Sequence, residues 1–347
     1  MNALKAPRSV KPIAIWLLIG IVMLMIQVVL GGITRLTGSG LSITEWKPIL
    51  GAFPPMNDQD WQIAFDKYKQ IGQYKHINFD FTLSDFKSIY FWEWFHREWA
   101  RLIAVAFVIP FIVFLIQKRF RKDMIVPFLI LFVGGALQGA IGWIMVKSGL
   151  NEDDISVNHI RLAAHFIGAL ILISYAVWFA LQLLIPRTDI IINKSLSNFT
   201  TSLIVILTLQ LIYGAFMAGL KAGVAAPTWP TINGQWIPEA KTSSWINDPI
   251  NVQFIHRGLA YLLTLLIVIW WWRLRKITGS NWVNKIKSLP FIIVIIQVVL
   301  GVFTVLHSPF RNELLWLGAA HQFTAMLLLV SFLWMKYLLR SKTPSFA

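Results

Sequence analysis

Long apolar runs alternate with short polar segments along almost the whole chain. About 20 consecutive apolar residues are enough to cross a bilayer as a helix. By that measure the pattern predicts eight transmembrane spans, at 12–33, 90–117, 124–146, 159–185, 200–220, 254–272, 289–307 and 314–338. An even number of spans places both termini on one side of the membrane. We therefore expect an all-α polytopic membrane protein.

The two halves of the chain resemble each other. The segment FHREWARLIAVAF at 95–107 aligns with IHRGLAYLLTLLI at 255–267, and RLAAHFIGALIL at 161–172 aligns with WLGAAHQFTAMLLL at 316–329. Each half has four spans, so corresponding spans share one orientation and are expected to be related by an axis near the membrane normal. The sequence thus predicts two tandem four-helix bundles, an N-terminal half over 1–186 and a C-terminal half over 187–347.

Four histidines take corresponding places in these halves, near the start of every even-numbered span: His96, His165, His256 and His321. A single histidine on an apolar helix is usually a core residue with its hydrogen bonds satisfied. Four in register across a duplication favour ligands, because an ionisable side chain is costly inside a membrane. Facing helices of a bundle can hold a haem between two imidazoles. Zinc is the alternative metal, but two histidines per half fall short of its usual four ligands.

The odd-numbered spans carry a repeat of their own, Gln-x-x-x-Gly. A spacing of four places both residues on one face, where glycine allows close helix approach and glutamine supplies an interhelical hydrogen bond. The simplest interpretation is helix packing, and contact with a porphyrin edge is the alternative. The four pairs are Gln27 and Gly31, Gln138 and Gly142, Gln210 and Gly214, and Gln297 and Gly301.

The halves differ at one position beside the histidines. Glu93 lies three residues before His96, whereas Gln253 lies three residues before His256. An acid one helical turn from a ligand can act as a base, a proton relay or a stabiliser of positive charge. An ion pair with Arg97, four residues on, is the structural alternative. Because the second half lacks only the acid, we expect Glu93 to be catalytic.

Arginines gather near the outer ends of the same spans. Guanidinium groups bind carboxylates through paired hydrogen bonds, as haem propionates would require, although each could instead anchor its helix at the interface. The candidates are Arg35, Arg97, Arg101, Arg161 and Arg257. His76, His159 and His307 have no partners in the repeat and are expected to be structural or surface groups.

Charge predicts the orientation of the chain. With the N-terminus inside, the inner segments hold 17 Lys and Arg and 2 acidic residues, and the outer segments hold 14 of each kind. The formal net charge of +15 therefore lies on the cytoplasmic side, as the positive-inside rule requires. Membrane topology and contact with anionic lipid explain the basic net charge. Nucleic-acid binding does not, because no soluble basic domain is present. We expect cytoplasmic termini and histidine sites toward the outer leaflet.

The chain contains no cysteine, which excludes disulfides, Cys-ligated iron–sulfur clusters, c-type haem attachment and thiol catalysis. The first span is too long for a signal-peptide core and lacks a clear cleavage site, so we expect it to be retained. The longest outer loop, 34–89, includes NDQDWQIAFDKYKQ, whose apolar residues have helical spacing. This segment predicts an amphipathic helix on the membrane or a lid over the first site.

Several motifs together resemble one known family. GGITRLTGSGLSITEWKPILGAFPP, EWFHR, RLAAH, IHRGLAY and GAAHQ are similar to haem A synthase of the proteobacterial and mitochondrial type. The likeness covers nearly the whole chain. One branch of that family carries a pair of outer-loop cysteines, which this chain lacks.

The resemblance implies an oxidoreductase that converts a methyl group of haem O to a formyl group, giving haem A for cytochrome oxidase. It implies that His96 and His165 bracket the substrate haem, that Glu93 is the acidic catalytic residue, and that His256 and His321 hold a resident haem b. Haem O synthase, an electron-transfer partner and a second copy of the chain are candidate partners. The short N-terminal segment favours a bacterial inner membrane over a mitochondrial one.

Two other classes of protein fit part of the pattern. A dihaem cytochrome b that exchanges electrons with quinol would also place four histidines in a bundle, but would leave the Glu93 to Gln253 difference unexplained. A transporter built from a duplicated unit would predict broken helices and charges at mid-membrane, whereas the ionisable residues here lie near the outer ends. Absorbance separates the cytochrome and the synthase from the transporter, which would be colourless.

Overall fold

The computed structural model describes residues 10–47, 51–239 and 242–342. Lys5 and Arg8, which count toward the predicted inner charge, lie outside these ranges. Within them, eight helices are long and apolar enough to cross a membrane, so all eight predicted spans are confirmed. They are α1 (Lys11–Leu36), α4 (Leu83–Ile116), α5 (Lys122–Lys147), α6 (His159–Leu184), α7 (Lys194–Gly219), α9 (Pro249–Leu274), α11 (Leu289–Leu306) and α12 (Arg311–Leu338).

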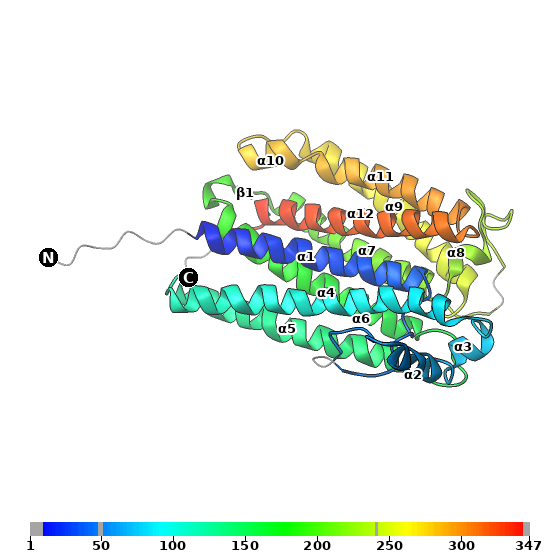
Figure 1. The fold of residues 1–347 in the computed structure, drawn as a ribbon. Helices are drawn as coiled ribbons and strands as arrows, with labels where there is room; N and C mark the ends of the chain where they lie inside the picture. The colour runs from blue at the N-terminus through cyan, green and yellow to red at the C-terminus, as the bar shows by residue number, and fades with distance from the viewer. Residues whose placement is uncertain (1–9, 48–50, 240–241, 343–347) are drawn as a thin grey trace.

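Short elements cover the two ends of the bundle. At one end lie α2 (Asp58–Tyr68), α3 (Gly72–His76) and α8 (Ala222–Ala225), and at the other lie β1 (Ile191–Ile192) and α10 (Asn281–Ile286) (Figure 1). The short helix η1 (Arg187–Asp189) precedes β1, which pairs in parallel with β2 (Leu339–Arg340). The end with α2, α3 and α8 is the predicted outer side.

Polar caps fix where three of the histidine-bearing helices begin. Thr82 and Asp85 form a reciprocal capping box at the start of α4. Asn158 accepts two backbone N–H groups at the start of α6, and Asp248 does the same at the start of α9. Such caps satisfy donors that a helix end leaves unpaired. The caps fix the first residue of each helix, and so they fix how far along the helix its histidine lies.

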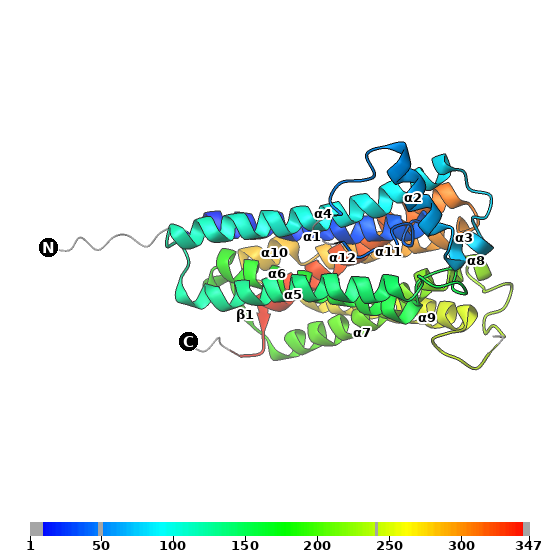
Figure 2. The ribbon, with the colours of Figure 1, turned by 60° about the horizontal axis from the view of Figure 1, so that its bottom comes forward.

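The eight long helices repeat one packing pattern. In the first half α1 packs on α4 and α6, and α5 packs on α6; in the second half α7 packs on α9 and α12, and α11 packs on α12. Between the halves, α6 packs on α7 and α12 packs on α1. Figure 2 shows the same bundle turned by 60°, with α1 and α4 along one side and α7 and α9 along the other. The boundary at residue 186 stays a prediction.

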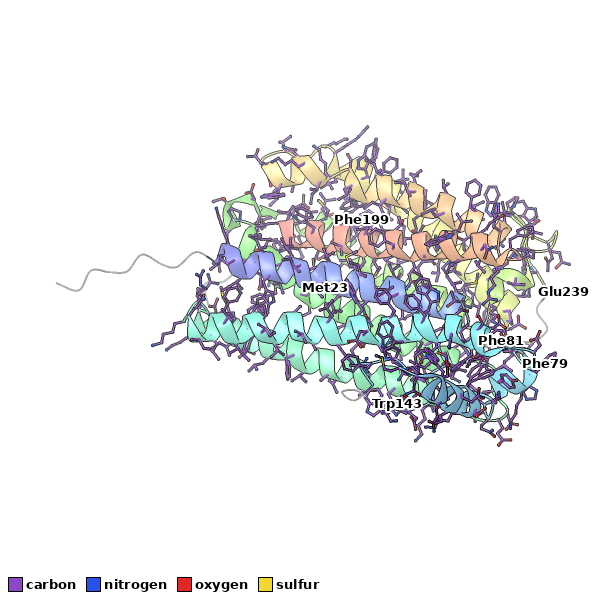
Figure 3. The ribbon with its side chains drawn as sticks, viewed as in Figure 1. Met23, Phe79, Phe81, Trp143, Phe199 and Glu239 are labelled. Atoms are coloured by element: carbon purple, nitrogen blue, oxygen red, sulfur yellow. The ribbon has the colours of Figure 1, made fainter. Side chains whose placement is uncertain are left out.

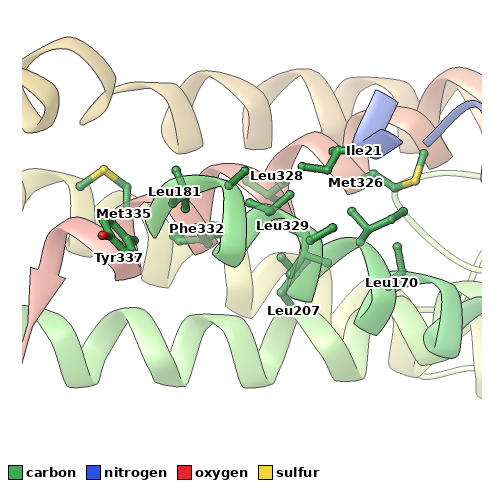
Figure 4. Close-up of a cluster of buried hydrophobic side chains, with 14 of the residues drawn as sticks. Ile21, Leu170, Leu181, Leu207, Met326, Leu328, Leu329, Phe332, Met335 and Tyr337 are labelled. Atoms are coloured by element: carbon green, nitrogen blue, oxygen red, sulfur yellow. The ribbon is translucent and has the colours of Figure 1, made fainter. Parts of the chain in front are cut away.

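A shared hydrophobic core joins the two halves. Ile21 and Leu181 from the first half belong to the same buried cluster as Leu207 and Phe332 from the second (Figure 4). The fully buried Trp270 packs edge-on to Phe332 and donates from Nε1 to Thr200 Oγ1 at 2.9 Å. The cluster lies along α1, α6, α7 and α12, so the central helices of both halves are held together by one core.

Candidate functional site

A large cavity lies among the spanning helices, bordered by members of the core cluster and by the outer loops. Its volume is about 1300 Å³, and residues from all eight spanning helices line it. Single ligand pockets usually enclose about 300–1,000 Å³. The cavity is therefore larger than one ordinary ligand needs, and it is continuous across the two halves.

The four repeated histidines all border this cavity. Each lies in the outer half of its helix and is half-buried. His96 and His165 are close enough to interact electrostatically, and so are His256 and His321. The structure thus brings the predicted ligands together within each half.

Each histidine is hydrogen-bonded by the glutamine of the preceding odd-numbered span. Gln138 Nε2 lies 2.6 Å from the backbone oxygen of His165 and 3.1 Å from its Nδ1. Gln27 donates to the backbone oxygen of His96 at 3.1 Å. The other two amides contact imidazole Nε2 atoms, Gln210 with His256 at 3.3 Å and Gln297 with His321 at 3.2 Å. The predicted interhelical hydrogen bonds are therefore present, and their partners are the histidines.

The glycine of each pair forms a seat for the same imidazole. A methyl group built on Gly142 would lie 2.8 Å from Cε1 of His165, and one on Gly301 would lie 2.9 Å from Cε1 of His321. The corresponding closest distances are 3.2 Å from Gly31 to His96 and 3.4 Å from Gly214 to His256. Sequence reasoning identified the Gln-x-x-x-Gly repeat but not this role, because spacing defines a face and not the residue that packs on it.

In the second half, each imidazole has one nitrogen without a hydrogen-bond partner. Gln210 and Gln297 occupy one ring nitrogen of His256 and His321, and the Nδ1 atoms of both rings are buried without a partner. Buried polar atoms are normally satisfied, so an orphaned pair indicates a missing partner. Two imidazoles that border one cavity, each with an unpaired nitrogen, fit the axial ligation of a haem iron.

Glu93 borders the first half of the cavity and is 2% exposed. Its Oε1 accepts from Arg97 at 2.7 Å, and its Oε2 accepts from the Ser42 hydroxyl at 2.7 Å and from the Ile43 N–H at 2.8 Å. The predicted alternative, an ion pair with Arg97, is present. The carboxylate is also joined to the loop after α1, a contact that spacing along α4 does not predict.

Gln253 takes the place of Glu93 in the second half. It is fully buried, donates to the carbonyl oxygens of Ala222 and Ala226, and accepts from Arg257 Nη2 at 2.9 Å. In both halves, therefore, the side chain at this position and the arginine four residues later bond to the loop at the outer end of the bundle. Only in the first half is the residue at this position, Glu93, an acid.

The predicted arginines divide by position. Arg35, Arg97, Arg101 and Arg257 border the cavity. Arg161 does not; it is exposed and donates to the carbonyl oxygen of Ile144 at the end of α5. Its contact is that of a helix-end anchor.

The outer loop forms a small packed layer over the first half. Phe65 and Tyr68 of α2 are buried against Phe86 of α4, in the predicted amphipathic helix. Burial raises the pKa of the Tyr68 phenol to about 12, so it serves as a neutral hydrogen-bonding group. Its hydroxyl donates to Gln73, which donates in turn to the carbonyl oxygen of Gly38 after α1.

Residues after α2 reach the cavity itself. Gln73, Ile77, Asn78 and Phe81 are among its lining residues. Figure 3 shows Phe81 at the outer end of the bundle, and Trp143 of α5 also lines the cavity. No residue of α2 lines the cavity, so the segment after the predicted amphipathic helix, and not the helix itself, reaches it. The role of a lid stays a prediction.

The remaining three histidines do not line the cavity. His76 is exposed and contacts the carbonyl oxygen of Glu152. His307 Nδ1 lies 2.9 Å from the Phe303 carbonyl oxygen, and its Nε2 lies 3.5 Å from Glu313. His159 begins α6, packs on Phe216, and has a buried Nε2 without a partner.

Comparison with known proteins gives the family. A model of the COX15-CtaA family, described as cytochrome oxidase assembly protein, matches residues 14–333. The chain belongs to this family. The predicted family resemblance is thereby confirmed, and the narrower proteobacterial and mitochondrial type stays a prediction.

Curated relatives of the COX15-CtaA chain match over nearly their whole length. A protein of Flavobacterium psychrophilum named haem A synthase is 44% identical over 93% of this chain and 97% of its own. One of the same name from Flavobacterium johnsoniae is 42% identical, with 92% and 95% covered. A third, from Parvibaculum lavamentivorans, is 40% identical with 96% of each chain covered.

Proposed function

We propose that this chain is a haem A synthase, an integral membrane oxidoreductase that oxidises a methyl group of haem O to a formyl group and so supplies haem A for cytochrome oxidase. The observation that carries the proposal is the repeated seat of glutamine, glycine and histidine around one cavity. Its four-fold occurrence, two per half, fits two bis-histidine haem sites. The name of the similar proteins supports the reaction.

His96 and His165 are assigned to the substrate haem and His256 and His321 to a resident haem b. A resident haem b would supply one-electron transfer when bound. The protein residues hold and orient the imidazoles: Gln210 and Gln297 each engage one ring nitrogen, and Gly214 and Gly301 give each ring room. Such outer contacts tune the ligands of a metal as well as positioning them.

Glu93 is assigned as the acidic catalytic residue of the first half. Among the described residues that line the cavity, it is the only carboxylate. Oxidation of the methyl group to a formyl group needs an external electron acceptor and a source of oxygen. The C–H bonds that break release protons, and we assign Glu93, at the cavity wall, to accept one. Arg97, Ser42 and the Ile43 N–H hold both oxygens in position and stabilise the ionised form.

The lid and the arginines are assigned to substrate binding. The segment with Gln73 and Phe81 closes the outer side of the first half and would limit the access of water. Arg35, Arg97, Arg101 and Arg257 border the cavity at the end where haem propionates would lie. Arg161 lies on the rim and anchors its helix.

We place the protein in the bacterial inner membrane, with both termini cytoplasmic and both haem sites toward the periplasm. The excess of Lys and Arg in the predicted inner segments supports this orientation. Haem O is the substrate. Haem O synthase, an electron-transfer protein and a second copy of the chain are the candidate partners.

The test is the identity of the haems in purified protein. Wild type, Glu93→Gln and Asp66→Asn proteins are produced with a source of haem O, and extracted haems are quantified by mass. Asp66 is the control, because it is also paired with a basic side chain, Lys69, but does not line the cavity. We expect haem A from wild type and the control, and haem O or an alcohol intermediate from Glu93→Gln. Only haem b in all three, with reversible reduction by quinol, would indicate the dihaem cytochrome b instead.

A further inference from the structure

The arginines that follow His96 and His256 direct their donors to the chain's own loops. Arg97 bonds the carbonyl oxygens of Ile43 and Glu45 as well as Glu93. Arg257 bonds Gln253 and the carbonyl oxygens of Ala226, Thr228 and Thr231. These guanidinium groups stabilise the outer connections. Most of their hydrogen-bonding capacity is used before any ligand enters.

Five other described cations border the same cavity, and three of them, Arg35, Lys221 and Arg311, lie at the ends of α1, α7 and α12. Arg35 lies in the last turn of α1, Lys221 follows α7, and Arg311 is the first residue of α12. Arg311 Nη2 donates to the Thr37 carbonyl oxygen at 2.7 Å, which brings α12 against the end of α1. The cluster therefore draws on both halves.

Among the described residues that line the cavity, no acid is paired with this cluster. Partial burial, followed by the positive charges of Arg35 and Arg311, holds the pKa of Lys221 below its ordinary value. The one carboxylate among the described lining residues, Glu93, is paired with Arg97. Lys221 also has φ 52°, a left-handed backbone that residues other than glycine rarely adopt. Converging like charges at a cavity mouth favour the binding of an anion.

The position of Arg35 relates the cluster to the histidine sites. Arg35 lies one helical turn beyond Gly31, the seat of His96. It also lies three residues beyond Gly32, against which Gln322, the neighbour of His321, packs. Arg35 is half-buried, whereas Lys221 and Arg311 are exposed. The cluster thus joins the cavity wall near both histidine pairs to the solvent.

We propose that Arg35, Lys221 and Arg311 form a carboxylate-binding site between the two halves, which takes a propionate of a bound porphyrin. The proposal rests on the proposed function, since it requires haem in the cavity. Arginine binds a carboxylate by two parallel hydrogen bonds, and lysine adds a point charge. A porphyrin held by an imidazole deeper in the bundle would direct its propionates toward this mouth.

The experiment measures haem release and rebinding with full-length purified protein. Release to excess apomyoglobin is followed by absorbance for wild type, for the triple variant Arg35→Gln, Lys221→Gln, Arg311→Gln, and for the control Arg161→Gln. The protein that has lost its haem is then titrated with haem b and, separately, with the dimethyl ester of haem b, which has no free propionates. The control replaces an outer arginine that does not line the cavity.

We expect the triple variant to release haem at least tenfold faster than wild type and Arg161→Gln. Wild type should bind haem b more tightly than the ester, and the triple variant should bind the two equally. Two results would overturn the site: wild type binding haem b and its dimethyl ester equally tightly, or the triple variant releasing haem at the wild-type rate. Equal binding of the two by wild type is also the result expected if the cluster holds a lipid phosphate. Purified wild type without haem would instead overturn the proposed function.

Single variants keep the test informative if the triple variant does not fold. Lys221→Gln should show part of the faster release, and Lys221→Arg, which keeps the charge, should restore the wild-type rate. Faster release in both single variants alike would indicate a structural role for the Lys221 position, and would contradict the carboxylate site.

Discussion

Gln138 of α5 contacts His165 of α6 through two atoms at once, the backbone oxygen at 2.6 Å and the imidazole Nδ1 at 3.1 Å. The Gln138 amide therefore holds the imidazole ring in a fixed orientation relative to the backbone of α6. A methyl group on Gly142, one turn along α5, would collide with the same ring. The two odd-span residues define where the imidazole lies before any ligand is bound.

Replacing the seat glycines should displace the histidines. We expect Gly142→Ala and Gly301→Ala to lower the haem content of purified protein by more than half, because overpacking a fitted contact costs about 1–3 kcal/mol. Haem per protein is measured by absorbance of the pyridine complex. Gly258→Ala is the control, since nothing lies within 4 Å of a methyl group there although it is two residues from His256. Equal haem content in all three variants would contradict the seat.

Removing the amide at Gln297 should alter the haem environment more than the stability. Gln297→Met keeps the side-chain length but loses the contact with His321 Nε2. Hydrogen bonds between membrane helices contribute on average about 0.6 kcal/mol, so the protein should still fold. We expect a changed midpoint potential of the resident haem in a redox titration. The exposed Gln70→Met should leave the potential unchanged; an equal shift in both variants would count against a positioning role.

The hydroxyl of Ser42 should support the chemistry of Glu93 without supporting haem binding. Ser42→Ala removes one of three hydrogen bonds to the carboxylate, a loss of about 1.5–3 kcal/mol for a bond to a charged group. We expect lower conversion of haem O with unchanged haem b content, measured together by mass. Ser88→Ala, which loses only a bond to the carbonyl of Asp85, should match wild type. Loss of haem b in Ser42→Ala would show that the bond is structural.

The lid should open when its core is emptied. Phe65 is 5% exposed and stacks on Phe86 with ring centroids 5.1 Å apart. Truncation of a buried phenylalanine costs about 3–5 kcal/mol, so Phe65→Ala should expose 51–81 to limited proteolysis while the spanning helices stay protected. Fragment masses report the cut sites. Ile63→Ala, at a position 47% exposed on the same helix, should keep the wild-type pattern.

The absence of native cysteines allows a direct test of topology. Asp153→Cys lies on the predicted periplasmic side and Lys122→Cys on the cytoplasmic side, and both positions are exposed. In intact cells a membrane-impermeant maleimide should label the first and not the second. Lysed cells should show labelling of both. The reverse pattern in intact cells would mean that the haem sites face the cytoplasm.

The spans were predictable because lipid requires an uninterrupted apolar helix, and that signal lies in the sequence itself. The main difference is α4, which begins at Leu83 rather than near 90. Its first turns are amphipathic and bury Phe86 and Ile89 against the loop, so an apolar window misses them. The capping box at Thr82 and Asp85 was the available signal.

The site was predictable only as far as repeats reveal it. Register across the halves identified the repeated histidines and the Glu93 to Gln253 difference, because duplicated polar residues stand out against lipid-facing ones. The hydrogen bonds of Arg97 and Arg257 to loop carbonyls were not predictable, since no spacing rule specifies how an irregular loop returns to a helix. The same limit hid Lys221 and Arg311, which come near Arg35 only through tertiary packing, α12 against α1 and α7 against α12.

One continuous cavity across both halves has a bearing on assembly of the active protein. A porphyrin between His256 and His321 would form part of the wall around a porphyrin between His96 and His165, since the two pairs border the same space. Filling one side then changes the affinity of the other, and by thermodynamic linkage the effect is reciprocal. Loading of either histidine pair should therefore depend on whether the other pair already holds its porphyrin.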